Sequence, residues 1–147
     1  MIVRRTTMED RPQLVELMQG YFAFYRKPLP TDDKLLEFLD ALEVDPDQGV
    51  QLVAEADGRL MGFASLYTIF DTLLADRILV MNDLFVRPDA RSGGIGAALF
   101  SASRTYAREH GFPRLDWVTA PDNVEAQRFY ERHGGRRGAW IPYSVTP

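Results

Sequence analysis

The chain has 147 residues, 46% of them hydrophobic, which is close to the usual size of one domain with a complete core. Its formal net charge of −4 disfavours nucleic acid as a main partner and mildly favours a cationic substrate. With no cysteine and only two histidines, neither a disulfide framework, a thiol nucleophile nor a metal centre is expected. No apolar run has signal or membrane-helix length, so we expect a cytoplasmic protein with a single domain, residues 1–147, and no membrane partner.

The first half of the chain predicts a strand, two helices and a hairpin. A helix should begin near Thr7, because Thr7 and Asp10 are spaced as in a capping box and apolar residues then recur at helical spacing. Pro28 should end this helix. The Asp-Gly pair at 57–58 separates two strand-like runs and is a strong hairpin signal. The expected elements are a strand at 2–6, a helix from Thr7, a helix from about Thr31, and strands at 50–56 and 59–70.

The second half of the chain predicts alternating strands and helices. A strand at about 77–86 leads through a glycine-rich loop into a helix that should end near His110, because Gly111 follows. The remaining expected elements are a strand at 115–119, a helix over 123–134 and a last strand at 139–145. The order βααβββαβαβ predicts an α/β fold with a mixed central sheet and helices on both faces.

The glycine-rich loop at 91–96 reads Arg-Ser-Gly-Gly-Ile-Gly and predicts an anion-binding site. Glycines let backbone N–H groups turn toward one point, and the following helix adds its unpaired N–H groups and positive dipole end. A nucleotide-binding P-loop would need lysine and then serine or threonine after Gly96, but Ala97 and Ala98 stand there. A dinucleotide-binding loop would need a third glycine where Leu99 lies, so that interpretation is weak.

A second motif lies at 123–134, which reads Asn-Val-Glu-Ala-Gln-Arg-Phe-Tyr-Glu-Arg-His-Gly and predicts a short helix capped by Asn123. It matches Asn-x-x-Ala-x-x-Phe-Tyr-x-x-x-Gly, and the loop matches Arg-x-x-Gly-x-Gly. With both motifs in this order, the chain resembles the GNAT superfamily of acyl-CoA N-acyltransferases, in particular the diamine and polyamine acetyltransferases. The resemblance covers almost the whole chain, because the expected order of elements is also that of the family.

The resemblance implies a cofactor, acetyl-CoA, and the residues that bind it. In this family the fourth and fifth strands splay apart, and the pantetheine arm pairs with the backbone of the fourth strand. A backbone N–H there, that of Leu84 or Phe85, should polarise the thioester oxygen. The diphosphate should bind the N–H groups of the loop. The cofactor-binding residues implied are Leu84, Phe85, Val86, Arg91, Ser92, Gly93, Gly94, Ile95, Gly96, Ala97, Asn123, Phe129 and Tyr130.

The resemblance also implies catalytic roles for Tyr130 and Asn123. Tyr130 matches the family tyrosine that acts as general acid and protonates the departing thiolate, although it could instead be a core aromatic residue beside Phe129. Asn123 could hydrogen-bond the pantetheine arm, cap the helix, or do both.

The proton acceptor cannot be assigned from the sequence. The strand around 82–86 looks like the Glu-Asp-Phe-Phe-Val strand of diamine acetyltransferases, but Asn82 replaces the glutamate, and an amide accepts no proton at neutral pH. Asp83 should point to the opposite face of the strand, and we interpret it as a structural residue that pairs with an arginine of a covering helix. A water relay to Asp71, Asp76 or a carboxylate of the first two helices, or an amine that arrives deprotonated, would serve instead.

The sequence therefore indicates direct acetyl transfer to the primary amine of a small molecule: a polyamine, an amino-acid-like amine or an aminoglycoside. The candidate substrate-binding residues are Asn82, Asp83, Phe24 and Tyr25, where the aromatic pair could also belong to the core. Two alternatives stay open: acetylation of a protein N-terminus or lysine, and a non-catalytic acyl-CoA-binding module. Because Pro142 places the last strand at a sheet edge with exposed apolar residues, we also expect a homodimer formed through 139–145.

Overall fold

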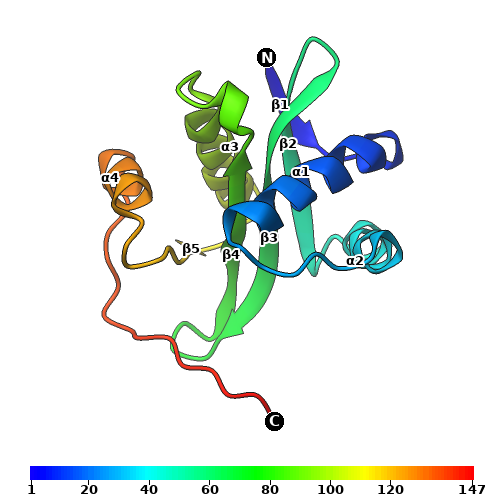
Figure 1. Cartoon of the computed structure of the whole chain (residues 1–147). Helices are drawn as coiled ribbons and strands as arrows, with labels where there is room; N and C mark the ends of the chain where they lie inside the picture. The colour runs from blue at the N-terminus through cyan, green and yellow to red at the C-terminus, as the bar shows by residue number, and fades with distance from the viewer. The chain divides into compact units, whose positions relative to one another are not determined.

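The structure is a computed structural model that describes residues 1–147 in two compact units, Met1–Trp117 and Val118–Pro147. The first unit contains a mixed five-stranded sheet in the order β1-β2-β3-β4-β5 (Figure 1). Neighbouring strands from β1 to β4 are antiparallel, and β5 is parallel to β4. The predicted α/β class is confirmed. The strands are β1 (Ile2–Arg5), β2 (Gly49–Ala56), β3 (Arg59–Asp71), β4 (Asp76–Val86) and β5 (Leu115–Asp116).

The helices of the first unit cover both faces of the sheet, with α1 and α2 on one face and α3 on the other (Figure 1). Consecutive residues of β3 point to opposite faces of the sheet and contact different helices. Phe63 packs in the core cluster with Leu14 and Leu17 of α1, whereas a Cβ on Gly62 would lie 3.2 Å from Leu99 of α3. The helical elements are η1 (Met8–Asp10), α1 (Arg11–Phe24), α2 (Asp32–Val44), η2 (Pro88–Ala90) and α3 (Ile95–Glu109).

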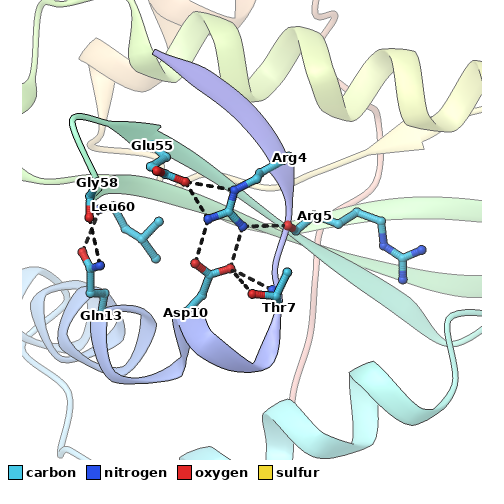
Figure 2. A network of polar contacts seen from close by, with 8 residues as sticks. All are labelled: Arg4, Arg5, Thr7, Asp10, Gln13, Glu55, Gly58 and Leu60. Carbon is cyan, nitrogen blue, oxygen red and sulfur yellow. Dashed lines mark hydrogen bonds and ion pairs between the residues drawn. The ribbon is translucent and has the colours of Figure 1, made fainter.

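A partly buried ionic network fixes the start of α1 against the sheet (Figure 2). The Arg4 guanidinium donates to both carboxylate oxygens of Asp10, at 2.6 and 2.8 Å, and to Glu55 of β2 at 2.6 Å. Asp10 also accepts the backbone N–H that precedes the first helical turn, which is one half of the predicted capping box. Gln13 then bonds the hairpin turn through the carbonyl of Gly58. The network therefore holds β1, α1 and the β2–β3 hairpin together.

The second unit consists of α4 (Val124–Arg132) and a C-terminal segment without regular secondary structure. The last strand expected at 139–145 is absent, so the predicted order lacks its final element. Pro142 has no N–H, and the large side chains around it are extensively exposed, 74% at Ile141 and 92% at Tyr143. The strand expected at 115–119 is also shorter, ending at Asp116. No helix in either unit is long and apolar enough to cross a membrane.

Candidate active site

The edge of β4 is open beyond its short pairing with β5. The two strands pair only at Leu79 and Val80, so within residues 1–117 the stretch 81–86 has β3 on one side and no strand on the other. Arg87 donates its N–H toward β3, to the carbonyl of Met61. Because N–H groups alternate along a strand, the N–H of Phe85 also faces β3, and those of Leu84 and Val86 face the open edge. Of the two predicted donors, Leu84 is therefore the one on the open edge.

A β-bulge at Asn82 brings two neighbouring polar side chains together. Asp83 lies opposite Ser65, but Met81 lies opposite the next residue of β3, so Asn82 has no partner across the ladder. The Asn82 amide donates to the Asp83 carboxylate at 3.1 Å. The expectation that Asp83 points away from Asn82 is therefore wrong, because the bulge interrupts the strict alternation of side chains.

Three tyrosines surround the Asp83 carboxylate. Burial, followed by hydrogen bonding to and the negative charge of Asp83, raises the pKa of Tyr21. Burial and then the same charge also raise the pKa of Tyr67 and of Tyr25. The three phenols stay protonated at neutral pH and present hydroxyl donors near one carboxylate. Asp83 forms no ion pair, so the interpretation that it pairs with an arginine of a helix is wrong.

The aromatic pair at the end of α1 is not part of the core. Phe24 is 49% exposed and Tyr25 41% exposed. The Arg91 guanidinium lies 5.2 Å from the centroid of the Phe24 ring, and its Nε donates to the carbonyl of Val86 at 3.3 Å. Phe24 thus contacts the arginine of the glycine-rich loop, whereas Tyr25 lies in the tyrosine group around Asp83.

The alternative carboxylates of β3 and β4 lie at the other end of the sheet. Asp71 and Asp76 are opposite each other where the β3–β4 hairpin turns, and Asp71 is paired with Arg114. Asp83 lies seven positions after Asp76 on β4, which at strand spacing corresponds to roughly 20 Å. Neither group is placed to receive a proton beside Asp83 through one short water relay.

The glycine-rich loop presents unpaired N–H groups at the start of α3. Ser92 and Gly94 have φ of 72° and 76°, and Ala98 is the first residue whose N–H bonds back to Gly94. The preceding N–H groups, from Ser92 to Ala97, bond to no protein acceptor. A Cβ at Gly94 would meet no atom within 4 Å, so the space in front of the loop is open. Open space, convergent N–H donors and a helix dipole fit a diphosphate group.

The second unit supplies the motif helix α4. Asn123 caps it, since its side-chain oxygen accepts the N–H of Ala126 at 3.1 Å and its amide N–H groups still remain as donors. The Tyr130 ring lies edge-on to Phe129 with centroids 5.2 Å apart. The carbonyl of Tyr130 accepts the N–H of Gly135 at 2.8 Å, which closes the helix. The roles of Asn123, Phe129 and Tyr130 toward the cofactor stay predictions.

Sequence reasoning missed two members of the tyrosine group as site residues. Tyr21 belongs to the apolar stripe of α1, and Tyr67 lies on a strand without any motif. Only the sheet register brings them to Asp83. A usable signal was the alternation of Ser65 and Tyr67 with apolar residues along β3, which places two polar groups on a buried face.

A mixed sheet that opens beside β4 and a turn with unpaired N–H groups at the start of α3 are the arrangement expected of an acyltransferase that uses an acyl-CoA donor. The chain belongs to the acetyltransferase (GNAT) family, whose sequence model matches residues 12–135. It is 34% identical to the uncharacterized N-acetyltransferase YhfO of Bacillus subtilis, over 91% of this chain and 89% of that protein. It is 27% identical to the D-amino-acid N-acetyltransferase HPA3 of Saccharomyces cerevisiae, over 89% of this chain and 82% of that protein.

The structural comparison agrees with the family assignment. The crystal structure of a probable acetyltransferase superposes with a TM-score of 0.87 at 30% identity, over 100% of this chain and 97% of the other. The protein is an N-acetyltransferase, and its cofactor is acetyl-CoA, the acyl donor of the family.

Proposed function

We propose that the protein transfers acetyl from acetyl-CoA directly to the primary amine of a small molecule, and that Asp83 binds this amine. The observation that supports this proposal is that Asp83 is a single carboxylate among three tyrosines and lies next to Leu84 on the open edge of β4. A carboxylate attracts an ammonium group, and aromatic rings add favourable contact with a cation.

The acceptor class that we propose is an amino-acid-like amine, a polyamine or an aminoglycoside. The name of the yeast relative, a D-amino-acid N-acetyltransferase, supports the first of these. Ring contacts of Tyr21 with Tyr25, Phe63 and Phe85, with centroids 5.0 to 6.0 Å apart, make this wall of the site rigid and apolar. Such a wall suits an amine carried on a short apolar stem.

Acetyl-CoA supplies the activated acyl group, and the residues of this chain hold it and move protons. The loop N–H groups from Ser92 to Ala97 bind the diphosphate, and the open edge of β4 orients the pantetheine arm. The N–H of Leu84 donates to the thioester oxygen as negative charge develops on it. Holding the amine and the thioester together can contribute about 7–11 kcal/mol to lowering the barrier.

Two proton transfers accompany the reaction in this proposal. The bound ammonium gives one proton to Asp83 and becomes a nucleophile. After the N–C bond forms and the C–S bond breaks, Tyr130 as general acid protonates the thiolate. The nitrogen releases its second proton to water, and the Tyr130 phenolate regains a proton from water. Asn123 contributes amide N–H donors to the pantetheine arm.

The experiment is a thiol-release assay with acetyl-CoA over polyamines, D- and L-amino acids, diamino acids, aminoglycosides and peptides. Asp83→Asn should raise KM for the active amine at least tenfold and leave the Kd for acetyl-CoA unchanged. Asp76→Asn, at the far end of the same strand, is the matched control and should behave as the parent. Turnover of peptides only would favour the protein-acetylating alternative, and acetyl-CoA binding without any thiol release would favour a non-catalytic module.

We also propose a homodimer formed through the C-terminal segment. Trp140, Ile141, Tyr143 and Val145 are exposed by 74–92%, and a second copy of the chain could cover them. Without a strand at 139–145, the contact rests on these side chains and not on an edge strand of one chain.

A further inference from the structure

A row of polar side chains crosses the buried face of the sheet and ends at Asp83. Gln51 of β2 lies opposite Ser65 of β3, and Ser65 lies opposite Asp83 of β4. Gln51 is 3% exposed and Ser65 is completely buried. Their neighbours two residues along the strands on the same face include Val53 and Phe63, which belong to the apolar cluster. Polar groups in such a layer are costly unless they are hydrogen-bonded, so each link of the row matters.

The hydrogen bond within this row runs from Gln51 toward the end of the row at Asp83. The Gln51 amide donates to Ser65 Oγ at 3.2 Å, which leaves the Ser65 hydroxyl proton for another acceptor. Tyr67, two residues along β3 on the same face, interacts with both Ser65 and Asp83. The Ser65 contact lowers the pKa of Tyr67 and the Asp83 contact raises it. Tyr67 therefore lies close enough to both residues for each of them to act on its hydroxyl.

The row begins at a small cavity under the other end of the sheet. Gln51 Oε1 is buried and accepts no hydrogen bond from a protein group. Gln51 lines a cavity of about 30 Å³ together with Arg5, Thr6, Thr7 and Arg11. A volume of this size holds about one water molecule, and the polar lining gives such a water further partners. A donor at this position would satisfy Gln51 Oε1.

We propose that the chain Gln51–Ser65–Tyr67 is a positioning device that fixes the Asp83 carboxylate for amine binding. This positioning role rests on the proposed function of Asp83, which is to bind the acceptor amine. The β-sheet register sets the spacing of these residues, and the Gln51 amide orients the Ser65 hydroxyl. Asp83 is faced by Tyr21 and Tyr25 from α1, by Tyr67 from β3 and by Asn82 on its own strand, so no other charged group from the elements around it orients the carboxylate.

Ser65→Ala breaks the chain in its middle without touching the substrate. We expect KM for the amine to rise about threefold to tenfold, the range of one hydrogen bond to a charged group. The acidic limb of kcat/KM should move to higher pH, because the charged carboxylate loses support. The Kd for acetyl-CoA should not change. Tyr67→Phe should have the same direction of effect, since it removes the donor next to Asp83.

A double variant separates positioning from stability. Ser65→Ala leaves the Gln51 amide buried without a partner, so its Tm should fall. Gln51→Met combined with Ser65→Ala removes both polar partners and should restore most of the Tm. The raised KM and the shifted pH profile should persist in the double variant. If recovery of the Tm also restores the KM and pH profile of the parent, the chain is structural only and the proposal is wrong.

The two proposals fail in different ways. If Asp83→Asn leaves the amine KM unchanged, Asp83 does not bind the acceptor and both proposals fall. If Asp83→Asn raises KM but the Ser65 and double variants match the parent in KM and pH profile, the acceptor site stands and the positioning chain is refuted. Adding Ser65→Ala to Asp83→Asn should change KM no further, because the chain acts only through Asp83.

Discussion

The loop at the start of α3 should lose cofactor affinity when Gly94 becomes alanine. Gly94 has a φ of 76°, and a Cβ there would meet no atom within 4 Å. Gly94→Ala therefore introduces no clash, and its effect comes from the backbone conformation. A left-handed conformation costs an L-residue about 1–2 kcal/mol. An alanine can relieve this strain by moving to negative φ, which turns the N–H groups of the first helical turn away from their common point.

The size of the effect follows from that conformational energy. Binding the diphosphate must restore the left-handed residue, so the 1–2 kcal/mol appears as loss of affinity. At about 1.4 kcal/mol per tenfold change, Kd for acetyl-CoA should rise roughly 5- to 30-fold. Isothermal titration calorimetry with acetyl-CoA measures this directly.

Gly111→Ala is the matched control for this experiment. Gly111 follows α3, has a φ of 73° and also has open space around its Cβ position. Both variants place an alanine at a position of similar left-handed φ, but only Gly94→Ala should bind acetyl-CoA more weakly. Equal affinities in the two variants would refute the assignment of the loop to the diphosphate.

Three further predictions concern stability, catalysis and assembly. Asp10→Asn should cost about 2 kcal/mol of unfolding free energy, because it weakens the charged hydrogen bonds between the buried Asp10 and the partly exposed Arg4. Hydrogen bonding to Arg4 lowers the pKa of Asp10. The parent therefore has this stabilisation above the unfolded carboxyl pKa near 3.9 and loses it as the pH falls through the folded pKa. Melts at several pH values should show that the variant loses less stability in acid than the parent. Tyr130→Phe should lower kcat about 10²- to 10⁴-fold with unchanged acetyl-CoA affinity, and an unchanged kcat would make Tyr130 a packing residue. Light scattering should show a dimer that dissociates when residues after Gly138 are deleted, and a monomeric intact chain would contradict the proposed assembly.

Local signals in the sequence predicted most of the first unit. The hairpin turn at 57–58 and the start of α3 contain left-handed backbone conformations, which only a few residue types adopt readily. Their positions can therefore be predicted from short segments of sequence. The N-cap of α4 at Asn123 was predicted for the same reason and is confirmed by its bond to Ala126.

The parts that could not be predicted depend on pairing between distant segments. A bulge has no strong sequence signal, so the face that Asp83 occupies became visible only in the β3–β4 register. The strand expected at 139–145 had suitable residues, but strand propensity is realised only with a partner strand to pair with. The tyrosines around Asp83 come from α1 and β3, and no spacing along the chain relates them to each other.

The order of strands in the sheet also has a consequence for folding. β2, β3 and β4 form a meander in which each strand pairs with the one that follows it, through the short turns at 57–58 and 72–75. Closing these turns costs little chain entropy, whereas joining β5 to β4 requires the whole of α3 to be in place. We therefore expect the meander to form early and β5 to dock late. In native-state hydrogen exchange, the N–H of Leu79, which bonds to Arg114 beside β5, should exchange faster than the N–H groups that join β3 to β4.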